Sequence, residues 1–122
     1  MKRFVFFFIL LVPMAFQLYA KDSLTAIVLS NKGGHHSEYY PPADMPEVYY
    51  DFDNLEIIIV GDGFASYYDV DIISQSTQLA AISTQIDGYG DSIDVSSLPD
   101  DDYTIIITSS NNNEYEGQFT NY

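Results

Sequence analysis

The chain has 122 residues, of which 18 are acidic and four are basic, and its formal net charge is −14. This charge argues against nucleic acid and anionic membrane surfaces as partners, because clustered Lys and Arg bind both. There is no cysteine, which excludes disulfides, thiolate metal sites and a cysteine nucleophile. The length predicts a single domain.

The first twenty residues have the pattern of a secretory signal peptide. Two basic residues, Lys2 and Arg3, precede an apolar run over residues 4–16, and the segment ends in the small Ala20. We therefore predict a signal-peptide helix over residues 1–20 and a protein of the periplasm or cell exterior, with no membrane anchor after cleavage. Cleavage leaves 102 residues with a formal charge of −16, because two basic residues leave and all acids stay. The alternatives are a buried N-terminal helix and an uncleaved anchor.

Residues 21–46 are expected to contain one strand, over residues 24–30, followed by an irregular loop. Residues 31–46 include a Gly-Gly and a Pro-Pro pair, which exclude a regular element there. Loops of this length in a small domain are often functional or disordered.

Residues 47–122 alternate between apolar and polar side chains with a period of two, which predicts short β-strands. Residues 79–86 fit a helix as well as a strand, and their Ser, Thr and Gln content favours the strand. Turn-forming residues separate the strands, and Asp53-Asn54 suits a tight hairpin because such residues tolerate positive φ. The spacing predicts one antiparallel sandwich or barrel. Strands are expected at residues 24–30, 47–52, 55–60, 68–72, 79–86, 92–96, 103–108 and 115–120.

The segment over residues 93–108 resembles the E–F corner of immunoglobulin-like and fibronectin-like sandwiches. A strand ends in Leu98-Pro99, three aspartates follow, and Tyr103 opens the next strand. The resemblance implies that the Tyr103 hydroxyl bonds back to the upstream backbone, with Leu98 as its buried companion.

The whole chain resembles a family of small secreted Bacteroidetes proteins of unknown function with an immunoglobulin-like β-sandwich. The signal peptide, a Pro-containing loop and a terminal hairpin running from Leu98 through Tyr103 to Phe119 carry the resemblance. The family usually carries Gly before this tyrosine, where the chain has an aspartate. The resemblance implies an all-β, antiparallel sandwich of about seven or eight strands, and it supplies no activity.

Two acidic clusters suggest a calcium site, since calcium binds six to eight oxygens. The EF-hand pattern is absent, and a solvated acidic face that keeps the protein soluble is the favoured interpretation. The candidate metal ligands are Asp51, Asp53, Asp100, Asp101 and Asp102.

The only histidines, His35 and His36, are adjacent in the predicted loop, with Glu38 and Asp44 nearby. Such residues could bind zinc or nickel. Neighbouring side chains rarely converge on one ion, so a polar loop is the favoured interpretation.

Three doublets stand out among the eleven tyrosines. On a strand, a doublet sends one ring to the core and the other outward, where it offers amphipathic surface to a protein or a sugar ring. The alternative is that tyrosine simply favours strands. The candidate ligand-binding residues are Tyr39, Tyr40, Tyr49, Tyr50 and Tyr67.

The sequence contains no Gly-x-Ser-x-Gly, His-Glu-x-x-His or phosphate-binding glycine loop. We predict a secreted, non-enzymatic binding or interaction module for an unknown protein or glycan, a monomer in preference to an oligomer. The alternative is a structural or assembly protein that pairs through an exposed edge strand. A small carboxylate hydrolase is less favoured, because so short a sandwich leaves little room for a cleft.

Overall fold

The computed structural model describes residues 23–31 and 43–121, which form nine strands and no helix. The signal-peptide helix predicted over residues 1–20 and most of the predicted loop lie outside the described residues. Within the described ranges, no helix is long and apolar enough to cross a membrane. The strands are β1 (Leu24–Ile27), β2 (Ser30–Asn31), β3 (Glu47–Asp51), β4 (Glu56–Val60), β5 (Tyr67–Ser74), β6 (Ala80–Asp87), β7 (Gly90–Asp94), β8 (Asp101–Ser109) and β9 (Glu114–Asn121).

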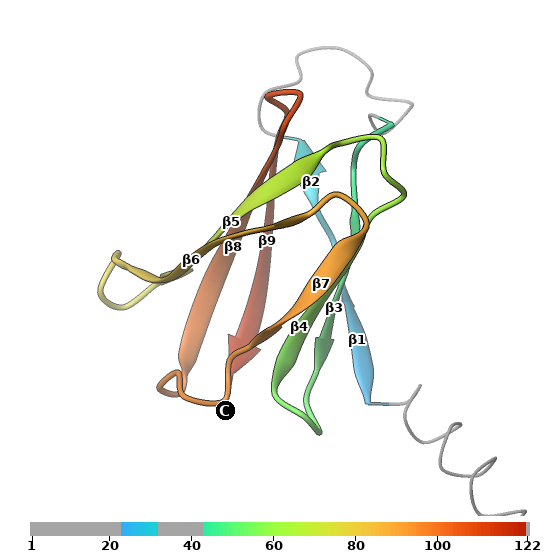
Figure 1. The fold of residues 1–122 in the computed structure, drawn as a ribbon. Coiled ribbons are helices and arrows are strands. Elements are labelled where there is room, and N and C mark those ends of the chain that lie inside the picture. Colours follow the sequence, from blue (N-terminus) through green and yellow to red (C-terminus); the bar gives the residue numbers. More distant parts are fainter. Residues whose placement is uncertain (1–22, 32–42, 122) are drawn as a thin grey trace, which may run out of the picture.

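The strands form two antiparallel sheets that pack face to face (Figure 1). The four-stranded sheet has the order β1-β3-β4-β7, and the five-stranded sheet has the order β2-β9-β8-β5-β6. The predicted all-β, antiparallel sandwich is therefore confirmed. Residues 79–86, which fitted two structures in the sequence, belong to strand β6.

The strand predicted over residues 24–30 is in fact two strands, which accounts for nine strands where the sequence suggested eight. β1 pairs with β3 in one sheet and β2 pairs with β9 in the other. The chain crosses between the sheets at Val28, which is 85 % exposed, while Ile27 and Leu29 on either side are buried. The prediction of one strand was wrong because an apolar stretch does not show where a strand changes partner.

Gly117 of β9 makes this crossing possible. A Cβ at Gly117 would lie 2.6 Å from Ile27 Cγ2, closer than real Cβ atoms approach, and 3.0 Å from Leu29 Cδ2, which is a tight contact. Only glycine therefore lets the crossing segment pack directly on β9.

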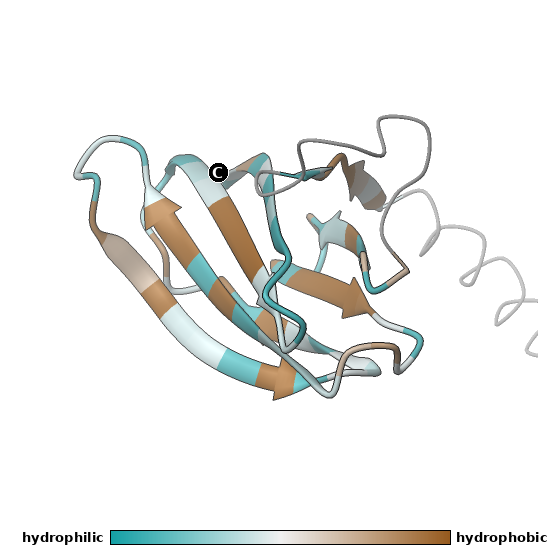
Figure 2. Cartoon of the chain, turned by 90° about the horizontal axis from the view of Figure 1, so that it is seen from above, coloured by the Kyte–Doolittle hydropathy of each residue, from teal (hydrophilic) through white to brown (hydrophobic). Residues whose placement is uncertain are grey.

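Period-two alternation places the core between the sheets. Along β8, Tyr103, Ile105 and Ile107 are fully buried, and the residues between them are partly exposed. Figure 2 shows hydrophobic and hydrophilic residues alternating along the strands. Phe119 of β9 stacks on both Tyr50 and Tyr103, with 5.4 Å between ring centroids in each pair. These rings join the two sheets at one end of the core.

The β3–β4 turn has a different geometry from the one predicted. Positive φ falls on Leu55 (52°) rather than on Asp53 or Asn54. The carboxylate of Asp51 instead accepts hydrogen bonds from the backbone N–H groups of Asp53 (3.0 Å) and Asn54 (3.2 Å). An Asx turn of this kind supplies the tight geometry without positive φ at its own residues.

The predicted corner has the implied hydrogen bond. The hydroxyl of Tyr103 donates to the backbone oxygen of Pro99 at 2.6 Å. Leu98 is half-buried and packs against the core. The segment between β7 and β8 is thus fixed at the end of the sandwich where β8 begins.

Candidate functional site

Every Lys, Arg and His of the chain lies outside the described residues, whereas all acids except Asp22 and Glu38 lie within them. The donors that bind the carboxylates of Asp44, Asp51 and Asp101 are neutral: hydroxyls, amides and backbone N–H groups. This arrangement decides which of the predicted acidic sites can serve a ligand.

Asp44 is the most enclosed of these acids, with 4 % of its surface exposed. Its carboxylate accepts hydrogen bonds from the hydroxyl of Tyr115 and from the side-chain amides of Asn111 (3.0 Å) and Asn113 (3.1 Å). Its backbone oxygen accepts a bond from Tyr68 at 2.7 Å. We call these five residues the Asp44 cluster. Asp44 is thus committed to the fold, and the carboxylate proposed beside His35 and His36 as a metal ligand already has its partners.

The Asp44 cluster shifts the ionisation of its members. Burial by itself raises the pKa of Asp44, but the hydrogen bonds from Ser109, Tyr115, Asn111 and Asn113 outweigh it, so the pKa lies below its usual value. Burial, with the nearby Asp44 charge, raises the pKa of Tyr68 to about 12. The cluster is therefore one charge held by neutral donors at neutral pH.

The first predicted calcium cluster serves the β3–β4 turn. β3 ends at Asp51, so Asp51 and Asp53 do not lie together on one face of a strand. Asp51 is buried and also accepts bonds from Ser23 (3.2 Å) and the side chain of Asn54 (2.8 Å). The Asp51 carboxylate thus already accepts hydrogen bonds from the turn and from Ser23.

The second predicted calcium cluster, residues 100–102, also binds donors of the fold. Asp101 accepts bonds from the hydroxyls of Ser74 and Ser76, each at 2.6 Å, and these bonds lower the pKa of Asp101 to about 2. Asp102 accepts a bond from Thr120 at 2.5 Å, and Asp100 lies in the preceding turn. Within the described part of the chain, no group of three His, Cys, Asp or Glu is placed to hold a metal ion.

The two tyrosine doublets within the described residues each split as predicted, with one ring inward and the other farther out. Tyr50 is buried and donates to Asn121 at 2.7 Å, and Tyr68 belongs to the Asp44 cluster. Tyr49 is half-buried and donates to Glu47 at 3.0 Å, while Tyr67 is 39 % exposed. Tyr39 and Tyr40 lie outside the described residues. The outward candidates are therefore Tyr49 and Tyr67.

Three loops meet beside Tyr67 at one end of the sandwich, and we call them the loop-end surface: residues 61–66, 87–90 and 110–113. Gly61 and Gly63 donate backbone bonds to the oxygens of Tyr89 (3.0 Å) and Gly88 (3.2 Å). Ser66 N–H donates to Ser110 Oγ at 2.8 Å. Segments distant in the sequence are thereby fixed to one another as a single surface.

Two glycines allow the loops this close approach. A Cβ at Gly88 would lie 1.9 Å from the backbone oxygen of Ala65, and a Cβ at Gly63 would lie 2.8 Å from the Tyr89 ring. Gly63 also has a φ of 88°, a value that side-chain-bearing residues rarely adopt. The ring of Tyr89 therefore lies directly over the backbone at Gly63.

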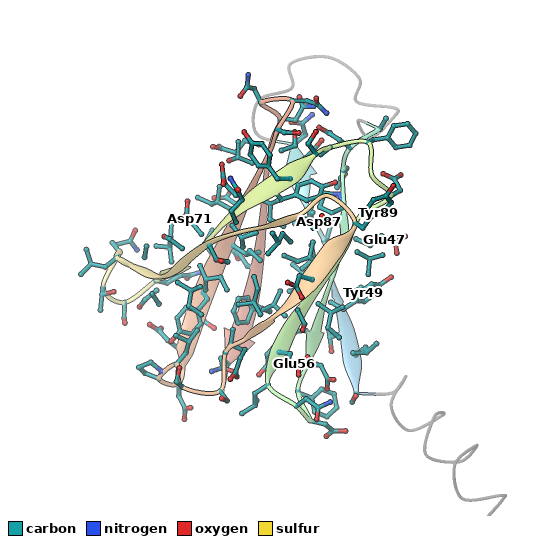
Figure 3. The ribbon with its side chains drawn as sticks, viewed as in Figure 1. Glu47, Tyr49, Glu56, Asp71, Asp87 and Tyr89 are labelled. Atoms are coloured by element: carbon teal, nitrogen blue, oxygen red, sulfur yellow. The ribbon has the colours of Figure 1, made fainter. Side chains whose placement is uncertain are left out.

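The loop-end surface exposes aromatic rings next to carboxylates. Phe64 is 66 % exposed and Tyr89 is 73 % exposed, in addition to the partly exposed Tyr67. Asp87 lies beside Tyr89 and accepts its backbone N–H at 2.8 Å, and Figure 3 shows both toward this end, opposite Glu56. Tyr, Ser, Gly and Asn in loops also dominate antibody combining sites, where they combine rigid contact area with adaptable hydrogen bonding.

The sequence prediction missed Phe64 and Tyr89. Each stands next to glycine inside a predicted turn, where an aromatic side chain has no strand face to enter the core. An aromatic residue in a Gly- and Asp-rich turn was the available signal. It could not have shown that the two turns pack together.

No family profile matches the sequence, and neither does any curated protein sequence. A solved structure is similar in fold: the crystal structure of a DUF3244 family protein with an immunoglobulin-like β-sandwich fold from Bacteroides vulgatus. The TM-score is 0.64 at 14 % identity, and the match covers 81 % of this chain and 99 % of that chain. The resemblance to Bacteroidetes proteins with this sandwich is thus confirmed at the level of the fold, and the architecture is immunoglobulin-like.

Proposed function

We propose that the protein is a secreted, non-enzymatic binding module that holds a neutral or cationic glycan on its loop-end surface. The observation that carries the proposal is the pair of exposed rings, Phe64 and Tyr89, on loops that backbone hydrogen bonds tie together. A fixed aromatic surface binds with little loss of side-chain entropy. The glycine-dependent packing of residues 61–66 on 87–90 supplies that rigidity.

The chemistry of the surface favours a sugar without negative charge. An aromatic ring can pack against the apolar face of a sugar ring, while the carboxylates of Asp62 and Asp87 can accept its hydroxyls. No described residue is basic, so the described part of the loop-end surface presents only like charge to an anionic glycan. Export is supported by the signal-peptide pattern of residues 1–20.

Binding can be tested with three immobilised polysaccharides: a neutral β-glucan, cationic chitosan and anionic alginate. We expect retention on the neutral or cationic material and none on alginate. The double variant Phe64→Ala/Tyr89→Ala should lose at least about tenfold in affinity, as loss of central aromatic contacts usually costs about 1.4 kcal/mol or more. Retention on alginate alone, or unchanged binding by the double variant, would overturn the proposal.

Phe52→Ala is the matched control. Phe52 is 52 % exposed in the β3–β4 turn, at the opposite end of the sandwich from the loop-end surface. Its removal takes away an exposed ring without touching the proposed site, so affinity should not change. New reducing ends released during the same incubations would contradict the non-enzymatic part of the proposal.

A further inference from the structure

The five-stranded sheet ends in a long free edge. Within the described residues β6 pairs only with β5, so every second residue of β6 directs its N–H and C=O away from the sheet. In Figure 1 the β5–β6 hairpin projects beyond the other strands. Ala80, Ala81, Ser83, Thr84 and Gln85 are all exposed along this edge.

From Ile82 to Ile86 this edge lacks the usual protection against pairing. Edge strands are normally short, charged, interrupted by proline or bent by a bulge. Of the other described edges, β1 and β2 have four and two residues, and β7 carries Asp91 and Asp94 within its five. β6 has eight residues and no charge before Asp87. The register shift between Ile72 and Ile73 of β5 leaves Ala81 of β6 without a partner, which is a bulge in β6 near the turn, and Ile82–Asp87 stay regular.

We propose that β6 pairs with β6 of a second copy of this chain, antiparallel about a two-fold axis through Thr84. This register places Thr84 opposite Thr84, Ser83 opposite Gln85, and Ile82 opposite Ile86. Pairs of β-branched and hydroxyl side chains are favourable cross-strand neighbours, and a two-fold axis makes the contact self-complementary. The five-stranded sheets of the two copies become one continuous sheet.

The acids near β6 do not prevent this pairing. Asp87 comes opposite Ala81, and the carboxylates of Asp69 and Asp71 on β5 accept bonds from Gln85 (2.9 Å) and Ser83 (2.6 Å). In this register Asp71 of one copy lies in line with Asp69 of the other, three strand spacings of about 4.8 Å away, which is about 14 Å. Exposed charges this far apart are largely screened at 0.15 M salt, where the Debye length is about 8 Å.

The second copy fits this edge better than a foreign strand does. The edge from Ala80 to Ile86 has no charge to select a charged partner, and from Ile82 to Ile86 its own sequence supplies the matching residues. The sequence favoured a monomer. With self-pairing through β6, we expect a monomer only at low salt, where the repulsion between the acidic copies is not screened. Because the strands run antiparallel, the two loop-end surfaces lie at opposite ends of the shared sheet.

The proposal is tested by measuring molar mass with size-exclusion chromatography and light scattering. The full sequence is expressed from residue 1, and the protein is purified in the processed form that the cell produces. We expect a dimer that strengthens as NaCl rises. Thr84→Lys should give a monomer, because it places two charges opposite each other, although it lowers the net negative charge. Gln118→Lys, an exposed position on the inner strand β9, should leave the dimer intact. A monomer at all salt concentrations, or a dimer that survives Thr84→Lys, would overturn the proposal.

Single cysteines test the register, because the chain has none of its own. In the proposed dimer, cross-strand Cα atoms at Thr84 lie about 4.5–5.5 Å apart, within disulfide range. Mild oxidation should therefore crosslink Thr84→Cys. The two Ser83 positions are offset, about 8 Å apart, beyond the limit of about 7 Å, so Ser83→Cys should crosslink poorly. Equal crosslinking of the two, or protection of β6 amides only after a different protein is added, would contradict self-pairing.

Discussion

The hydroxyl of Tyr115 donates a hydrogen bond to the carboxylate of Asp44, across 71 residues of sequence. Both residues are buried, and the bond joins strand β9 to the segment that precedes β3. The same carboxylate is bonded by Asn111 and Asn113 in the loop between β8 and β9. The Asp44 cluster thereby fixes residues 110–113, one of the three loops of the loop-end surface.

Replacing Tyr115 with Phe should lower the free energy of unfolding by about 1–3 kcal/mol, because it leaves a buried carboxylate short of a donor. Urea denaturation followed by circular dichroism measures the change. Tyr49→Phe is the matched control: its hydroxyl bonds an exposed Glu47, and its loss should cost no more than about 0.5 kcal/mol. Equal costs for the two variants would show that the Asp44 cluster adds nothing special.

Gly117→Ala should destabilise the protein by about 1–3 kcal/mol, since its new methyl group overlaps Ile27 and Leu29. The midpoint of urea unfolding is the measurement, and Gln118→Ala, at the exposed neighbouring position, is the control. If Gly117→Ala were neutral, the crossing between β1 and β2 would not pack on β9 as described.

Tyr103→Phe should cost about 0.5–1.5 kcal/mol by removing the bond to Pro99 at the corner. The ring remains to stack on Phe119, so the fold should persist with unchanged circular dichroism. Thermal unfolding measures the loss. A variant as stable as the parent would assign the corner no energetic role.

Acid should destabilise the fold partly through Asp101. Its pKa is lowered from 3.8 to about 2 in the folded protein, so its contribution is complete above pH 3.8 and disappears as pH falls toward 2. Asp101→Asn should therefore flatten the fall of melting temperature between those two values. Asp100→Asn removes the same charge one residue away and serves as control. Parallel melting curves for Asp101→Asn and the parent would contradict this linkage.

Salt should stabilise the protein without a requirement for calcium. The described acids repel one another with no described basic residue between them, and ions screen this repulsion. Melting temperature should rise with NaCl, and CaCl₂ at matched ionic strength should add nothing, because Asp51 and Asp101 already bind neutral donors. A calcium-specific rise reversed by EDTA would restore the predicted metal site.

Local sequence is enough to predict which face of strands such as β5 and β8 enters the core. Alternation in β5 and β8, the split of Tyr67 from Tyr68 and the corner at Tyr103 are local properties, set by the two-residue repeat of an extended chain. The resemblance to a known sandwich rested on the signal-peptide pattern, the Pro-containing loop and the terminal hairpin from Leu98 to Phe119.

Which strands become neighbours, and what lies at their ends, depends on packing between distant segments. The change of sheet at Val28, the enclosure of Asp44 and the meeting of Phe64 with Tyr89 all depend on contacts between segments far apart in the sequence. Alternation shows which face of a strand is buried, but it does not show which strand lies beside it. Any neighbouring strand can satisfy the same backbone hydrogen bonds. For the same reason the sequence did not predict that β6 is an edge strand, because edge strands and inner strands can have the same apolar and polar alternation.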